Sequence, residues 1–233
     1  MDLRELEQGV DPSGHWYYQT KAQALALSLQ RVGHTPGVVK DIGAGSGFFS
    51  SFLLERHHNA KALCIDPNYT DEQLGQSTGR LTFERQDTWG PADLYLFMDV
   101  IEHVPDDTRL LEHYVEDAPP GALFFISVPA FEFLWSGHDV YLQHYRRYTL
   151  PQLERVSVRS GLEVLYGRYL YGTTFPVVLA LRTLRRRSHA VASDLRPAGP
   201  RLNGLLTNIL SAENRLRGNR VAGSTAIVLA RRR

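Results

Sequence analysis

A run of alternating glycines is the first place in this sequence where the residue types point to chemistry. Gly43, Gly45 and Gly47 lie in the motif D-x-G-x-G-x-G, whose acid is Asp41. Glycine lacks a side chain and tolerates positive φ, so a flat ligand can approach such a backbone closely. An apolar run precedes the glycines and a helical pattern follows them, so the N–H groups that open the helix can bind a polar or anionic group. The pattern predicts strand, binding turn and helix.

Further acids stand where other segments with the pattern of buried strands end. Each segment is a short apolar run, and the carboxyl ends of parallel strands form one edge of an open α/β sheet, where ligands bind. With Asp41 in the first run, four predicted parallel strands each end near a carboxylate. The acids that end the runs at residues 62–66, 80–87 and 92–99 are Asp66, Asp87 and Asp99.

Four motifs in a fixed order carry a family resemblance. They are DIGAGSG at residues 41–47, CIDP at 64–67, RQDTW at 85–89 and DLYLFMDVIEHV at 93–104. Over residues 38–128 the chain resembles the class I S-adenosylmethionine-dependent methyltransferases, and its last motif resembles small-molecule methyltransferases of the ubiquinone-biosynthesis type. The resemblance implies an α/β, Rossmann-like fold: a seven-stranded, mostly parallel sheet with an antiparallel edge strand and helices on both faces.

The resemblance also implies a cofactor, S-adenosylmethionine, and a product, S-adenosylhomocysteine. The glycines would seat the methionine part, Asp66 the ribose and Asp87 the adenine. Asp99 would face the methionine amine, and Lys21, which follows an aromatic segment, would meet the methionine carboxylate; alternatively, these aromatic residues only anchor the first helix. The expected cofactor-binding residues are Lys21, Asp41, Gly43, Gly45, Gly47, Asp66, Asp87, Thr88 and Asp99.

A nicotinamide oxidoreductase is an alternative with a similar fold. An acid such as Asp66, nineteen residues after Gly47, can accept hydrogen bonds from ribose hydroxyls in either class of protein. The nicotinamide fingerprint G-x-G-x-x-G is absent from the glycine run, however. Binding of each cofactor would separate the two functions.

Histidines after the fourth and fifth predicted strands are candidates for proton transfer. His103 is the first candidate for a general base because imidazole titrates near neutral pH, with His138 and His144 behind it. The alternative is that His103 only holds its loop, since methyl transfer often needs alignment alone. A metal reading of His138, Asp139 and His144 lacks the paired i, i+4 ligand motif, so we expect no metal.

The segment after the fifth predicted strand is crowded with aromatic and basic residues. It resembles a segment of many bacterial small methyltransferases in which a tryptophan, a histidine–aspartate pair and H-x-R-R-Y recur. Arginines there could hold a carboxylate or phosphate, or the polar residues could instead brace the loop. The candidate acceptor-binding residues are Trp135, Arg146, Arg147 and Tyr148.

We expect a single methyltransferase domain over residues 1–233. An N-terminal helical extension covers residues 1–35, and residues 36–172 and 221–233 supply the core sheet, including strands at 122–128, 161–171 and 221–230. The long connection at 173–220 reads as an inserted helical pair, with helices near 175–184 and 202–216 and a loop at 188–200. It could cap the pocket, form a homodimer face or touch a membrane surface.

Composition bounds the remaining choices. The 233 residues are 43% hydrophobic and 22% charged, which is ordinary for a soluble globular protein. The single cysteine, Cys64, excludes an intrachain disulfide, and the acidic N-terminus does not read as a signal peptide, so we expect a cytoplasmic protein. The net charge of +1 hides twelve arginines after residue 181. This basic part suits an anionic partner or is simply solvated.

The sequence thus predicts methyl transfer from S-adenosylmethionine to a small-molecule acceptor, at oxygen, nitrogen or carbon. An anionic or lipid-linked acceptor would suit the basic C-terminal part, and no nucleic acid partner is expected. The alternative from another class is a non-catalytic module of the same fold that binds an anionic lipid or nucleic acid through that basic part.

Overall fold

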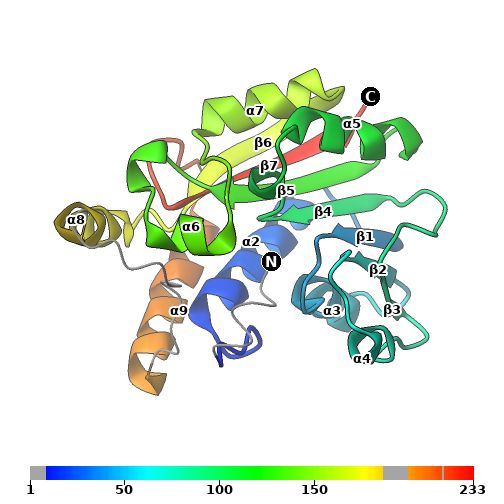
Figure 1. The fold of residues 1–233 in the computed structure, drawn as a ribbon, viewed down its shortest axis with the longest axis horizontal. Coiled ribbons are helices and arrows are strands. Elements are labelled where there is room, and N and C mark those ends of the chain that lie inside the picture. Colours follow the sequence, from blue (N-terminus) through cyan, green and yellow to red (C-terminus); the bar gives the residue numbers. More distant parts are fainter. Residues whose placement is uncertain (1–8, 186–198, 217) are drawn as a thin grey trace.

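The computed structural model describes residues 9–185, 199–216 and 218–233, and its centre is one seven-stranded sheet (Figure 1). The strand order is β3-β2-β1-β4-β5-β7-β6. β1 to β5 pair in parallel, whereas β7 runs antiparallel to both β5 and β6. The strands are β1 (Val38–Ile42), β2 (Lys61–Ile65), β3 (Leu81–Glu84), β4 (Leu94–Met98), β5 (Leu123–Pro129), β6 (Leu162–Leu170) and β7 (Thr225–Arg232).

Helices cover both faces of the sheet, as Figure 1 shows. On one face α5 (Asp107–Asp117) and α7 (Leu150–Arg159) bury residues such as Leu111 and Leu153 in one apolar cluster, and α7 packs on β6 and β7. On the other face α2 (Trp16–Arg31), α3 (Phe48–Arg56) and α9 (Pro200–Arg215) bury residues such as Leu25, Leu53 and Leu210. The short elements are α4 (Asp71–Leu74), η1 (Ile101–His103), η2 (Glu132–Leu134) and α6 (Gly137–Leu142). The Rossmann-like fold and the antiparallel pair at the sheet edge are confirmed.

The strand boundaries differ slightly from the sequence prediction. β7 begins at Thr225, later than the predicted 221, because residues before it form a loop tied by Asn219, whose side-chain amide donates to the Ala222 carbonyl at 2.8 Å. β3 ends at Glu84, so Asp87 lies in the loop after the strand and not on it. Neither shift changes which edge of the sheet carries the acids.

The long connection between β6 and β7 contains the two expected helices, α8 (Phe175–Arg185) and α9. α9 packs against α2, where the Asn214 amide donates to the Thr20 carbonyl at 2.7 Å. α8 reaches the segment after β5, where Arg182 donates to the Leu134 carbonyl at 2.9 Å. The predicted loop at 188–200 and the first eight residues of the N-terminal extension fall mainly outside the described residues.

Both inserted helices expose apolar side chains. The exposed residues are Val177, Leu179, Leu181, Leu184, Leu202, Leu205 and Ile209. In the part of the chain that the structure describes, no helix combines the length and apolar character needed to cross a membrane. The single-domain division and the role of residues 173–220 stay predictions.

Candidate active site

The glycine run forms a tight loop between β1 and α3. All three glycines have positive φ, at 63°, 56° and 70° in chain order. A Cβ atom on Gly43 would lie 2.8 Å from Cγ2 of Val100, and one on Gly47 would lie 2.8 Å from the Phe83 ring. The loop therefore needs glycine at these two positions for its conformation and for its packing. The backbone N–H of Gly43 donates to the Ile65 carbonyl at 2.7 Å, which fixes the loop beside the end of β2.

Asp66 lies directly after β2 and faces the glycine loop. Its carboxylate accepts hydrogen bonds from the backbone N–H of Gly45 at 3.3 Å and from that of Asn68 at 3.0 Å. The side-chain amide of Asn68 also donates to this carboxylate at 3.1 Å, so Asp66 is held beside the glycine loop. The predicted neighbourhood of glycine loop and acid is present.

Asp41 supports the same loop from within the sheet. It is fully buried, and the Ser50 hydroxyl of α3 donates to its Oδ2 at 2.9 Å. This contact ties the start of α3 to the end of β1. Asp41 is thus placed to hold the shape of the loop.

A buried ion pair lies after β4. Lys21 of α2 is paired with Asp99 and also donates to the Tyr17 hydroxyl at 2.6 Å. Asp99 accepts a further hydrogen bond from the Ser127 hydroxyl at 3.0 Å, and its φ is 55°. Burial favours the neutral acid, but the Lys21 charge and these hydrogen bonds outweigh burial and lower the pKa of Asp99. Lys21, expected to bind the methionine carboxylate, and Asp99, expected to bind the methionine amine, are therefore in direct contact with each other.

Asp87 and Thr88 lie exposed in the loop after β3. Asp87 accepts from the Lys40 ammonium of β1 at 2.6 Å, and the Thr88 hydroxyl donates to Glu84. These contacts link Asp87 to the middle of β1 and not to the glycine loop. The role of Asp87 in adenine binding, and that of Thr88 in cofactor binding, stay predictions.

The structure brings His103 and His144 together. Their rings meet edge to face with centroids 4.6 Å apart, while the ring of His138 lies 6.4 Å from that of His144. Burial, and then the neighbouring charge of His144, lower the pKa of His103 to about 3. His103 is therefore a neutral imidazole at physiological pH and a weak base.

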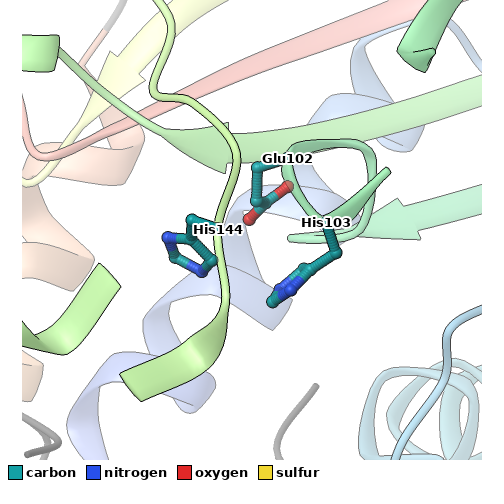
Figure 2. A group of neighbouring side chains, drawn as sticks. All are labelled: Glu102, His103 and His144. Atoms are coloured by element: carbon teal, nitrogen blue, oxygen red, sulfur yellow. The ribbon is translucent and has the colours of Figure 1, made fainter. Parts of the chain in front are cut away.

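Glu102, which the sequence analysis did not single out, joins the same cluster (Figure 2). It is fully buried in η1, and neither carboxylate oxygen has a hydrogen-bond partner among the described residues. Burial, and then the charge of Asp99, raise the pKa of Glu102 well above its usual range. The only sequence signal was an acid within the apolar context of DVIEHV, and His144 comes from a distant segment.

Asp139 organises the segment that follows β5. Its carboxylate accepts from Nε of Arg147 at 2.7 Å, from Nδ1 of His144 at 2.9 Å and from the Ser136 backbone N–H at 2.9 Å. Burial alone favours the neutral acid, but these hydrogen bonds and the Arg147 charge hold the pKa of Asp139 well below its usual range. Arg147 is buried and also donates to the Ala130 carbonyl at 3.0 Å.

The remaining predicted acceptor residues lie around this segment. Arg146 contacts Asp107 at 3.2 Å, and the buried Tyr148 hydroxyl donates to the same carboxylate at 2.7 Å. Burial and this hydrogen bond raise the pKa of Tyr148 well above its usual range. Trp135 is half-buried after η2. These contacts match the alternative of a braced loop, and an acceptor-binding role stays a prediction.

Comparison with known proteins agrees with this architecture. A family model described as a methyltransferase domain matches residues 15–166. An uncharacterized methyltransferase of Mycobacterium sp. (strain JLS) is 31% identical over 120 residues, which cover 48% of this chain and 47% of that protein. The chain thus spans about half the length of the curated relatives that it matches.

Solved methyltransferase structures share the fold. An S-adenosylmethionine dependent methyltransferase from Mesorhizobium loti has a TM-score of 0.56 at 17% identity, covering 90% of this chain and 98% of that one. The plantazolicin methyltransferase BpumL, in complex with a monoazolic desmethylPZN analog and SAH, has a TM-score of 0.56 at 14% identity, covering 92% of this chain and 83% of that one. At such identities the likeness concerns the fold. Because the family model matches more than half of the chain, this chain belongs to the methyltransferase-domain family.

Proposed function

We propose that this chain transfers a methyl group from S-adenosylmethionine to a small-molecule acceptor. The observation that carries the proposal is the positive-φ glycine loop beside Asp66, in a chain of this family. When bound, the cofactor supplies a methyl group activated by a sulfonium. The contribution of the protein would be to hold the acceptor in line with that group and to keep water away.

The residues at the carboxyl edge fit this cofactor chemically. The glycine loop offers backbone without side-chain bulk, and Asp66 offers acceptor oxygens for ribose hydroxyls. The Lys21–Asp99 pair offers one ammonium and one carboxylate, which complement the carboxylate and the amine of a methionine end. The roles of these residues are part of the proposal.

The acceptor would lie between η1 and the segment after β5. Aromatic rings gather there: Phe131 stacks on Phe133 with centroids 5.0 Å apart, and Phe175 of α8 lies 5.5 Å from Phe131. Arg182 fastens α8 to the same segment. These contacts support the proposal that α8 forms one side of the acceptor site. A homodimer or membrane contact through residues 173–220 would involve the exposed apolar side chains of α8 and α9.

Binding of S-adenosylmethionine and S-adenosylhomocysteine, measured by calorimetry, tests the cofactor site. Asp66→Ala should weaken binding by about 1–3 kcal/mol, the usual cost of losing hydrogen bonds to a charged group. The matched control is Asp71→Ala, whose exposed carboxylate pairs with Arg85 on the surface and should leave affinity unchanged.

Two outcomes would count against this assignment. Equal affinity in wild type and Asp66→Ala would remove Asp66 from the site, and binding of a nicotinamide dinucleotide in place of S-adenosylmethionine would contradict the function. Incubation with methyl-labelled S-adenosylmethionine and a metabolite extract should give a labelled small product. The absence of a labelled product from a protein that binds the cofactor would favour the non-catalytic binding module.

A further inference from the structure

Three side chains converge beside the predicted acceptor site without satisfying one another. Glu102 and His103 come from η1, and His144 comes from the turn after α6 (Figure 2). One ligand atom from each side chain lies within 4.8 Å of the other two. In this view the Glu102 carboxylate and the two imidazole rings form the corners of a triangle. We propose that Glu102, His103 and His144 bind a divalent transition-metal ion.

Each imidazole is already committed at one nitrogen. Nδ1 of His144 lies 2.9 Å from Asp139, a carboxylate that can only accept, so Nδ1 carries the proton. His103 bonds to the backbone of Leu142 in a way that favours the protonated ring, so the ring donates and the carbonyl accepts. In each neutral ring the other nitrogen then has a lone pair.

In the described part of the chain, no hydrogen-bond donor contacts these nitrogen lone pairs. Nε2 of His103, Nε2 of His144 and both carboxylate oxygens of Glu102 are buried and have no hydrogen-bond partner among the described residues. Buried polar groups are normally paired, because leaving one unpaired costs about 1–3 kcal/mol, and more for a charged group. Several acceptors facing one another call for a shared positive partner.

The surroundings are those of a metal centre. A carboxylate that accepts from the outer nitrogen of a ligating histidine fixes its ring orientation, and Asp139 does this for His144. Arg147 and the Ser136 backbone N–H hold Asp139 in turn. Glu102 is held through its backbone, because its carbonyl accepts from the Tyr145 N–H at 2.8 Å, which joins η1 to the segment that carries His144.

The ligand set selects the kind of ion. Two imidazoles and one carboxylate suit Zn²⁺, Fe²⁺, Co²⁺ or Ni²⁺, whereas Mg²⁺ and Ca²⁺ prefer oxygen ligands throughout. Three protein ligands leave positions open for water or another small ligand, as in catalytic sites and unlike closed structural ones. The proposal goes beyond methyl transfer and does not depend on it.

Cobalt provides a direct test on the full-length protein after treatment with a chelator and its removal. Co²⁺ should bind with a stoichiometry of one per chain and give visible absorption bands, and Zn²⁺ should abolish these bands by displacement. Glu102→Gln and His144→Gln should each weaken Co²⁺ and Zn²⁺ binding by at least about tenfold, since even residues outside the ligand shell commonly matter that much. The control His113→Gln changes an exposed histidine of α5 and should bind like wild type.

A second measurement keeps the test decisive if a variant folds poorly. Zn²⁺ should raise the melting temperature of the wild-type protein, and the ¹⁵N shifts of two histidine Nε2 atoms should move on binding. A wild-type protein that shows neither Co²⁺ bands nor a Zn²⁺-dependent rise in melting temperature would overturn the proposal. So would Co²⁺ binding that is unchanged in folded Glu102→Gln and His144→Gln; in that case a proton shared within the cluster would be the better account.

Discussion

Two fully buried carboxylates lie on either side of His144, and their surroundings are opposite. Asp139, in α6, accepts hydrogen bonds from a guanidinium, an imidazole and a backbone N–H. Glu102, in η1, has no partner for either carboxylate oxygen among the described residues. The hydrogen bonds of Asp139 stabilise the fold. The unpaired oxygens of Glu102 fit the proposal that this carboxylate binds a metal ion. Burial alone therefore does not tell the role of a charged residue; the donors around it do.

Removing the satisfied carboxylate should have the largest effect. Asp139→Ala leaves Arg147 buried without its anionic partner, so the free energy of unfolding should fall by about 3–5 kcal/mol in urea titration. Asp106→Ala is the control. Asp139 takes part in the cap of α6 and Asp106 caps α5, but Asp106 is exposed, so its replacement should lower the free energy of unfolding by only about 0.5–2 kcal/mol. Equal losses in the two variants would mean that Asp139 acts only as a cap.

Removing the buried hydroxyl of Tyr148, which donates a hydrogen bond to Asp107, should lower stability less than Asp139→Ala does. Tyr148→Phe removes the buried hydrogen bond to Asp107 and should lower the free energy of unfolding by about 1.5–3 kcal/mol. Asp107 keeps its contact with Arg146, so the effect should stay below that of Asp139→Ala. Tyr145→Phe, at an exposed tyrosine, should be neutral. Identical unfolding curves for Tyr148→Phe and wild type would show that water replaces the lost hydroxyl.

The smallest effect should come from the unsatisfied carboxylate, despite its complete burial. Glu102→Met replaces an unpaired buried acid with an apolar side chain of similar size, so without metal the free energy of unfolding should stay within about 1 kcal/mol of wild type or rise. The comparison variant is Glu116→Met on the exposed side of α5, which should change stability by less than about 0.5 kcal/mol. A loss of several kcal/mol in Glu102→Met would show that Glu102 makes strong hydrogen bonds and that the contrast with Asp139 is wrong.

The glycine loop and its neighbouring acid could be predicted from the sequence because their signals are local. The glycine loop, its flanking strand and helix, and Asp66 at the next strand end all follow from periodicity and spacing over a few tens of residues. The topology of parallel strands then brings their carboxyl ends to one edge. The pairing of Lys21 with Asp99 could not be predicted, because it depends on how α2 packs over the end of β4.

The histidine cluster shows where the sequence signal ends. From the sequence, His103 and His144 are candidate catalytic bases, and His144 is also considered as a metal ligand with His138 and Asp139. Glu102 is not singled out, because it is one acid in an apolar run. Their grouping depends on the Tyr145 N–H that bonds to η1 and on the Asp139 network that turns His144 inward. Such contacts between distant segments leave no spacing pattern. His138 is closer to His144 in the sequence than His103 is, but its ring lies farther from the His144 ring, at 6.4 Å compared with 4.6 Å for His103.

The position of β7 has a consequence for how the chain is made. Among the strands that the structure describes, β6 pairs only with β7, which is synthesised after α8 and α9. Until Thr225–Arg232 have left the ribosome, β5 and β6 both have open edges, and open edges template pairing with other chains. Closing so long a connection is also slow compared with local helix formation. We therefore expect the nascent chain to pass through an incomplete sheet with open edges that favour aggregation. Insertion of β7 between β5 and β6 completes the sheet and closes these edges.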